Sequence, residues 1–253
     1  MAHLRLIARL DIKAPHLIKG IHLEGVRVVG NPQVFAHRYY MSGVDELLYV
    51  DAVASLYGRN SLTDLVRHTA ENVFIPITVG GGLRSVEDVR AMLRAGADKV
   101  AINTAAVMRP ELIREIAETF GSQCMVVSIQ AKRRPAGGWE ALMDGGREHT
   151  GFDAIDWARR CQDLGAGEIL LTSVDQEGTR KGFDVRLTTA VADAVTIPVI
   201  ASGGMGEADH LTSVVAEGRA DAVAMAHVLH YDKLSLSDIR SHAHASGLSV
   251  RKL

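Results

Sequence analysis

Internal duplication is the feature that most restricts what this chain can fold into. The segment FIPITVGGGLRSVEDV returns as TIPVIASGGMGEADHL, with Pro76 matching Pro198 and Gly82 matching Gly204 at the same interval. AGADKVAIN returns as GRADAVAMA, and VDELLYVDAVA is echoed by AGEILLTSVDQEG. Because the matches keep their order along the chain, they indicate one structural unit that has been duplicated.

Short apolar runs alternate with segments of helical periodicity along both halves. The runs are LRLIARL, ELLYVDAVA, IPITVGGG, DKVAINTA, CMVVSIQ, EILLTSVD, IPVIASGG and DAVAMAHV. Segments such as SVEDVRAMLRAGA and PELIREIAETFGS lie between them and carry apolar residues at i, i+3 and i+4. Strands alternating with helices form parallel sheets, and eight such units close into a barrel. We therefore predict an α/β fold in which residues 1–253 form a single (β/α)8 TIM barrel domain, built from two duplicated half-barrels.

Composition and motifs exclude several classes of function. Lys and Arg total 28 against 30 Asp and Glu, a formal net charge of −2, so the basic field that nucleic-acid binding requires is absent. No apolar stretch approaches the ~20 residues of a membrane span, and the first residues do not resemble a signal peptide. The distant cysteines Cys124 and Cys161 suit reduced thiols. We expect a cytoplasmic protein without a metal or cofactor, binding neither nucleic acid nor membranes.

Glycines just past strand ends predict two phosphate sites. In such a barrel the C-terminal ends of the strands form the working face, and glycine lets backbone N–H groups approach an anion there. One site would comprise Gly81, Gly82, Asn103 and Thr104, and the other Gly178, Ser202, Gly203, Gly204 and Ala226. Tight turns alone would explain one glycine pair, but two pairs at symmetric positions favour phosphate binding.

Other polar residues finish strands at the same face. Asp11, in RLDIK, is a candidate general acid or base, with a helix cap or a surface aspartate as the alternative. Lys19 is a candidate anion contact, although a solvated loop lysine would give the same sequence pattern. Further candidates at this face are Asp51, Thr172, Asp175 and Glu177.

Four charged residues stand at the opposite ends of the strands. They are Arg5, Glu46, Lys99 and Glu168. Side chains alternate along a strand, so Arg5 shares the face of Asp11, and Lys99 shares the face of Asn103. A ring of such charges inside the barrel costs desolvation unless the charges pair. The alternative is four ordinary solvated charges at the rim.

The motifs resemble those of a known family over essentially the whole chain. The matching stretches are LDIK with IKG, DELLYVDAVAS, IPITVGGGLRSVEDV, GADKVAINTAAV, ETFGSQ, TG with DWARR, GAGEILLTSVDQEGT and IPVIASGGMG. They are similar to the cyclase subunit of imidazole glycerol phosphate synthase, a lyase-type enzyme of histidine biosynthesis. The resemblance implies a duplicated barrel that binds a long substrate with a phosphate at each end.

The resemblance also implies a partner. In that family a glutaminase subunit docks on the bottom face of the barrel, and the ammonia it releases crosses the barrel interior. The family's gate of four alternating charges corresponds to Arg5, Glu46, Lys99 and Glu168. Its two catalytic aspartates correspond to Asp11 and to position 130.

At two positions the chain departs from the family pattern. Position 130 is Gln130, whose amide has no proton to give near neutral pH and is a very poor base. Position 9, in the family's usual CLD, is Arg9, which by parity points into the lumen and needs a carboxylate such as Asp11 or Glu46. We therefore expect weak imidazole-forming activity.

Three alternatives remain open. A paralogue from surface-polysaccharide synthesis would channel ammonia for the amidation of a sugar and serve as conduit rather than catalyst. An aldose-ketose isomerase would use strand-end carboxylates, but Gln130 and the charge ring argue against it. A binding barrel without catalysis is the third.

Overall fold

Eight parallel strands close into a barrel in the computed structural model, which describes residues 3–54 and 62–252. The strands are β1 (Arg5–Lys13), β4 (Glu46–Asp51), β5 (Ile77–Gly80), β6 (Lys99–Ile102), β7 (Met125–Arg133), β10 (Glu168–Ser173), β11 (Val199–Ser202) and β12 (Ala222–Met225). They pair in sequence order, and β12 returns to β1 while β10 pairs with β7. The predicted (β/α)8 barrel is confirmed.

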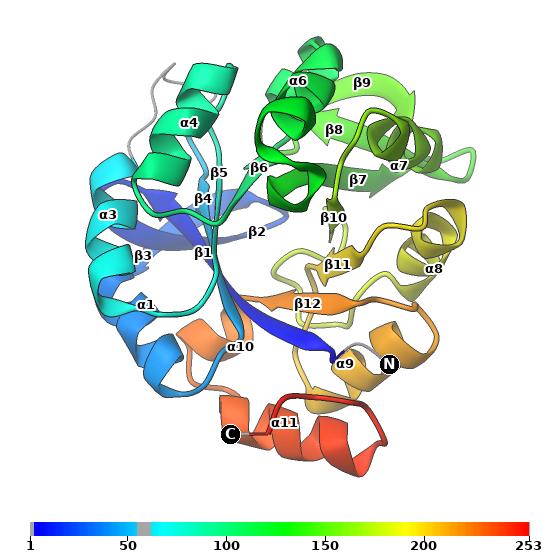
Figure 1. Cartoon of the computed structure of the whole chain (residues 1–253). Helices are drawn as coiled ribbons and strands as arrows, with labels where there is room; N and C mark the ends of the chain where they lie inside the picture. Colours follow the sequence, from blue (N-terminus) through cyan, green and yellow to red (C-terminus); the bar gives the residue numbers. More distant parts are fainter. Residues whose placement is uncertain (1–2, 55–61, 253) are drawn as a thin grey trace.

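Helices surround the barrel on the outside (Figure 1). They are α1 (Pro32–Met41), α3 (Thr63–Asn72), α4 (Val86–Arg94), α5 (Thr104–Met108), α6 (Glu111–Phe120), α7 (Ala154–Asp163), α8 (Val185–Ala194), α9 (Ala208–Ala216), α10 (His227–His230) and α11 (Leu236–Ala245), with a 3-10 turn at Ser122–Cys124. Local signals set their starts: Ser85 and Asp88 form a capping box on α4. None of the described helices is long and apolar enough to cross a membrane.

Two β-hairpins, which we did not predict, extend the barrel at its C-terminal face. The first, β2 (His16–Ile21) with β3 (Glu24–Gly30), pairs with the end of β1; the second, β8 (Trp139–Met143) with β9 (Glu148–Asp153), pairs with the end of β7. Each hairpin follows the first strand of its half-barrel. The duplication therefore includes the hairpins, whose sequences have diverged too far to be recognised as repeats.

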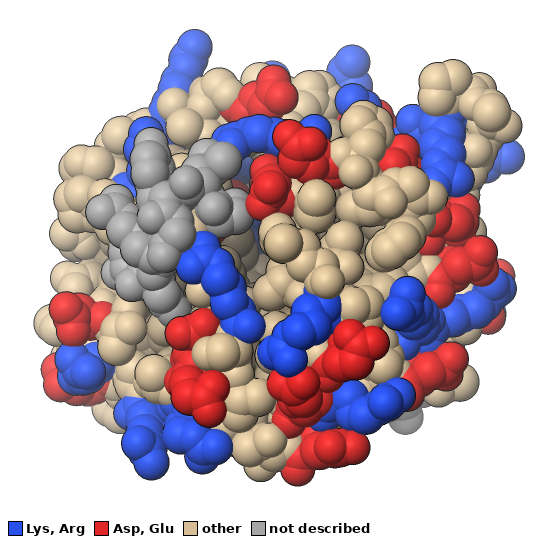
Figure 2. Space-filling view, turned by 90° about the horizontal axis from the view of Figure 1, so that it is seen from above, with Lys and Arg blue, Asp and Glu red and all other residues tan. Residues whose placement is uncertain are grey.

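Apolar side chains form two layers. The larger core lies between the strands and the helices, and both cysteines are buried in it as free thiols. A smaller cluster fills the middle of the lumen: Ile7, Leu48, Ala101, Val126, Leu170, Ile200, Ala222 and Ala224. On the side of the molecule shown in Figure 2, acidic and basic residues are interspersed without a continuous basic area.

A buried ion pair ties the last helix to the bottom of the barrel. Arg240 of α11 donates to Asp45 Oδ1 at 2.6 Å and to the Gly43 carbonyl at 2.6 Å. The other carboxylate oxygen of Asp45 accepts the Leu6 N–H of β1 at 2.8 Å. Asp45 therefore joins the helix to the strand at which the barrel closes.

We expect the Arg240→Met substitution to lower the free energy of unfolding by ~3–5 kcal/mol, because it leaves the carboxylate of Asp45 buried with fewer partners. The midpoint of urea denaturation measures the effect. Arg67→Met is the matched control, since Arg67 pairs with Asp64 on the exposed side of α3 and should contribute below ~1 kcal/mol. Equal midpoints for the two variants would contradict the role of the pair.

Candidate functional site

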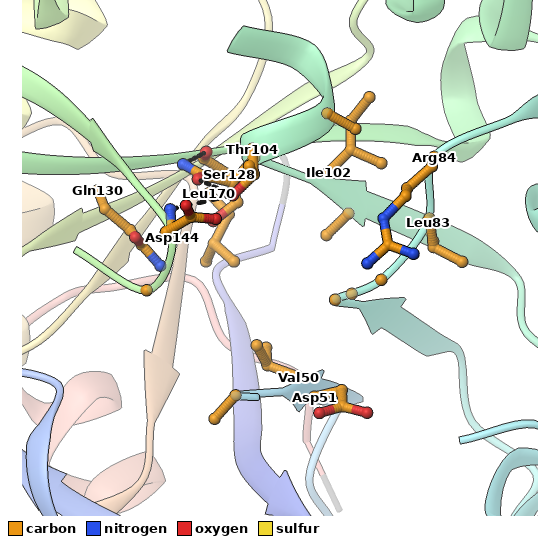
Figure 3. A pocket seen from close by; sticks show the side chains of 18 of the residues that line it. Val50, Asp51, Leu83, Arg84, Ile102, Thr104, Ser128, Gln130, Asp144 and Leu170 are labelled. Carbon is orange, nitrogen blue, oxygen red and sulfur yellow. Dashed lines mark hydrogen bonds between the residues drawn. The ribbon is translucent and has the colours of Figure 1, made fainter. Parts of the chain in front are cut away.

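A cavity of about 420 Å³ opens at the C-terminal ends of the strands (Figure 3). The first predicted phosphate site forms part of its wall: Gly81, Gly82, Asn103 and Thr104. Gly81 has a φ of 93°, and a Cβ there would clash with the Asp51 carbonyl oxygen. Glycine is required at this close approach of two chain segments. Asp51 lines the same cavity, and its Oδ1 accepts the Val53 N–H at 3.1 Å.

The second predicted phosphate site lines a separate and much smaller space of about 20 Å³. Its five residues come together there: Gly178, Ser202, Gly203, Gly204 and Ala226. Gly204 has a φ of 108°, and a Cβ at this position would clash with the carbonyl oxygen of Gly182. Lys19 and Glu177 form a buried ion pair in this space. An anion bound here would compete with Glu177 for the Lys19 ammonium.

Arg9 and Asp11 form a buried ion pair in the upper lumen. Arg9 Nε donates to Asp11 Oδ1 at 2.9 Å, and Arg9 Nη1 reaches across the barrel to Thr172 Oγ1 at 3.1 Å and Ser202 Oγ at 3.0 Å. The carboxylate that meets Arg9 is thus Asp11 and not Glu46. Burial alone would raise the pKa of Asp11, but the charges of Arg9 and Lys19 outweigh it and hold this pKa below its ordinary value.

Gln130 occupies the position in β7 that Asp11 occupies in β1. Asp11 is the first residue of β1 in register with its hairpin, opposite Ile18, and Gln130 is the first residue of β7 in register with its hairpin, opposite Leu142. The Gln130 amide lines both the large cavity and a small space beside Arg9 and Asp11. Its Oε1 is buried without a hydrogen-bond partner among the residues that the structure describes.

The remaining candidates at this face have structural partners. Thr172 accepts a hydrogen bond from Arg9, Glu177 pairs with Lys19, and Asp175 Oδ2 accepts the Arg133 N–H at 2.8 Å. His227 lines the small space beside Gly178, and burial together with Arg180 and Lys19 lowers its pKa. The described residues include no group of His, Cys, Asp and Glu able to hold a metal ion.

The four charges at the N-terminal ends of the strands form a closed ring. Arg5 Nη1 donates to Glu46 at 2.8 Å and to Glu168 at 3.1 Å. Lys99 Nζ donates to Glu46 at 3.3 Å and to Glu168 at 2.9 Å. Each cation thus bridges both carboxylates, and the apolar lumen cluster lies among the same strands, above the ring. The alternative of four independent solvated charges is wrong.

Sequence reasoning missed three charged residues of the large cavity, Arg84, Arg109 and Asp144. Asp144 stands in the turn between β8 and β9 and lines the cavity together with Gln130. Figure 3 draws the two side chains on the same side of the cavity, away from Asp51. The missing signal was the hairpin itself, because MDGG at residues 143–146 is a recognisable turn only between two strands.

Comparison with known proteins identifies close relatives. A family model described as "Histidine biosynthesis protein" matches residues 5–235. An "Imidazole glycerol phosphate synthase subunit HisF" from Legionella pneumophila is 67% identical over 207 residues, covering 82% of this chain and 98% of the relative. Proteins of the same name from Synechococcus sp. strains CC9311 and CC9605 are 52% and 51% identical and cover 100% and 99% of this chain, and 98% and 100% of themselves.

The glycine pairs predict anion sites that can be tested directly. In crystals soaked in concentrated phosphate, we expect one ion beside Gly82, Asn103 and Thr104 and a second beside Gly178, Gly203 and Gly204, because glycine lets backbone N–H groups approach an anion closely. The second ion requires Lys19 to leave Glu177, so it should bind more weakly. Electron density that shows no ion at the first place and none at the second would contradict the assignment of these glycine pairs to phosphate binding.

Proposed function

Because this chain belongs to the histidine biosynthesis protein family, with relatives named as the cyclase subunit of imidazole glycerol phosphate synthase, we propose that it uses ammonia from a glutaminase partner. The chain is an enzyme of the lyase or cyclase type. Its proposed substrate is a bis-phosphorylated, ribulosyl-type compound, and its proposed cellular location is the cytoplasm. The glutaminase would bind at the bottom face, around the charge ring.

The two glycine-lined sites on one face of the barrel carry this proposal. Gly81 and Gly82 follow β5, and Gly203 and Gly204 follow β11, which is the equivalent strand of the second half-barrel. A ligand that fills both sites must carry an anionic group at each end and cross the barrel mouth between them. The Asp11 carboxylate and the Gln130 amide lie at the ends of β1 and β7, where the middle of such a ligand would lie.

The interior supports a route for ammonia from the bottom of the barrel to the top. The ring of Arg5, Glu46, Lys99 and Glu168 stands at one end, and Asp11 stands at the other. Small or apolar side chains between them, such as Ala101, Ala222 and Ala224, favour neutral ammonia over ammonium, because burying an uncompensated charge is costly. Arg9 spans the upper end of this route, so ammonia must pass its guanidinium.

A second candidate is supported by Gln130 and by the Arg9–Asp11 pair. In a conduit of the kind found in surface-polysaccharide synthesis, the barrel would pass ammonia to another protein and carry out little ring closure. Both candidates require the glutaminase, so co-purification with a glutaminase separates them from an isomerase or a binding barrel. Turnover of the bis-phosphorylated ribulosyl substrate with free ammonia separates them from each other, because a conduit would show little or none.

For Lys99→Ala we expect weaker coupling between glutamine hydrolysis and product formation, because the substitution leaves Glu46 and Glu168 paired with Arg5 alone and opens the ring. Product formed per glutamine hydrolysed is the quantity to measure, with ammonia-dependent turnover expected to stay unchanged. Lys132→Ala, at the exposed end of β7 on the opposite face, is the control. Unchanged coupling in Lys99→Ala would mean that the ring does not gate ammonia.

We expect Gln130→Asp to raise ammonia-dependent turnover by up to ~10²-fold, the lower end of what a positioned acid or base contributes. In Arg9→Cys the pKa of Asp11 should rise, since the Arg9 charge that lowers it is removed. A base acts only in its ionised form, and a base with a higher pKa becomes protonated at a higher pH. The loss of rate on the acidic side of the pH–rate profile should therefore begin at a higher pH in Arg9→Cys. Wild-type turnover equal to that of Gln130→Asp would refute the assigned cost of Gln130.

A further inference from the structure

We propose that Asp144 is the catalytic acid and base of the second half-barrel in this chain, supplying the proton transfer that Gln130 cannot. The inference rests on the proposed function, because it concerns the same cavity and the same reaction. Its starting point is the position of the Asp144 carboxylate on the wall of the large cavity beside Gln130.

Strand register places Asp144 next to Gln130. Gln130 lies opposite Leu142 in the antiparallel pair of β7 and β8, and Asp144 is the second residue after Leu142. Asp144 is the first residue beyond β8, so it follows directly on the end of the strand that pairs with Gln130, and both residues line the large cavity. The adjoining turn also comes close, because a Cβ on Gly146 would lie 3.8 Å from Gln130 Oε1.

Contacts with the first glycine-lined site hold this turn in place. The Asp144 N–H donates to Thr104 Oγ1 at 3.0 Å, and Asn103 Nδ2 donates to the Leu142 carbonyl at 3.1 Å. Asp144 has a φ of 50°, a left-handed conformation that aspartate and asparagine adopt more readily than most residues. The turn is therefore fixed to the wall of the cavity at two points, which limits where the carboxylate can lie.

The Asp144 carboxylate has no hydrogen bond or ion pair within the described ranges, 3–54 and 62–252. The neighbouring carboxylates differ in this respect. Asp11 is paired with Arg9, Glu177 with Lys19, and Asp175 with the Arg133 N–H. Across the cavity, Asp51 accepts the Val53 N–H. A carboxylate that is partly buried and directed into the cavity is available to take and return a proton.

The addition of ammonia to a ketone requires a group that moves protons from the nitrogen to the oxygen. When ammonia adds to the ketone carbon of a ribulosyl-type substrate, a C–N bond forms, and the carbonyl oxygen takes up the electron pair of the former C=O π bond. Asp144 would accept a proton from the new ammonium nitrogen and become a carboxylic acid. The acid would return that proton to the alkoxide oxygen, which gives a carbinolamine. A second transfer by the same carboxylate, from the amine nitrogen to the hydroxyl oxygen, lets that oxygen leave as water while the nitrogen forms the C=N bond of an imine. No transfer needs an oxidant or a reductant.

The test compares Asp144→Asn with Glu148→Gln, an exposed acidic residue of the same hairpin that lies outside the cavity. Asparagine keeps the left-handed turn, so Asp144→Asn should fold normally, as far-ultraviolet circular dichroism and thermal unfolding will show. We expect kcat with ammonia to fall ~10²-fold or more in Asp144→Asn, with KM nearly unchanged. Glu148→Gln should behave like the wild type. In a Gln130→Asp background, Asp144→Asn should cost much less.

Four results would overturn the assignment. An Asp144→Asn enzyme with wild-type kcat and a lower KM would show that Asp144 only repels the substrate phosphate. A kcat loss of the same size in the Gln130→Asp background would show that Asp144 does not stand in for position 130. Turnover that appears only after Gln130→Asp would show that Asp144 cannot carry the proton. No turnover in the wild type or in Gln130→Asp would remove the proposed function itself, and this assignment with it.

Discussion

Closure of the parallel barrel is the constraint on which the rest of the structure depends. The two half-barrels meet where β6 pairs with β7 and where β12 pairs with β1, and these seams bring all the C-terminal strand ends to one face. Residues far apart in the chain, such as Arg9 and Ser202, thereby come within 3.0 Å. The same closure gathers the N-terminal ends, so that four charges from four strands form one ring at the bottom.

Charged and apolar layers of side chains alternate along the barrel lumen. Each layer limits the hydrogen-bond partners that the adjacent layer can find. The bottom ring satisfies its charges internally, because two cations bridge two carboxylates. The apolar cluster above it offers no hydrogen bonds, so Arg9 finds its partners in its own layer, at Asp11, Thr172 and Ser202. Replacing one partner of such a buried pair typically lowers the free energy of unfolding by ~3–5 kcal/mol. The Arg9 side chain is therefore a fixed element of the upper lumen.

Sequence periodicity and internal repetition were sufficient to predict the barrel and most of the strand ends. Parity along β1 placed Arg9 on the same face as Asp11, because alternation is a property of the strand alone, but it left Asp11 and Glu46 open as partners until the structure showed Asp11. The Lys19–Glu177 pair was beyond prediction, since it joins a hairpin to a loop after β10 and depends on how both fold over the barrel mouth. Asp144 was missed for the same reason: its position in the cavity follows from strand pairing and not from a local motif.

The two hairpins show how a duplicated fold can divide its chemistry unequally. In the first half-barrel the strand contributes the carboxylate, Asp11, and the hairpin contributes a cation, Lys19. In the second half-barrel the strand contributes the neutral Gln130, and the hairpin contributes the carboxylate, Asp144. In each half-barrel, the first strand and its hairpin together thus supply one carboxylate to the site, Asp11 or Asp144, but on elements of different rigidity. A carboxylate on a barrel strand is positioned by the closed sheet, whereas one on a hairpin turn depends on two hydrogen bonds to the cavity wall. If Asp144 has taken over proton transfer, the precision of that step is set by Asn103 and Thr104, and binding at the first glycine-lined site and catalysis are then coupled through the same two residues.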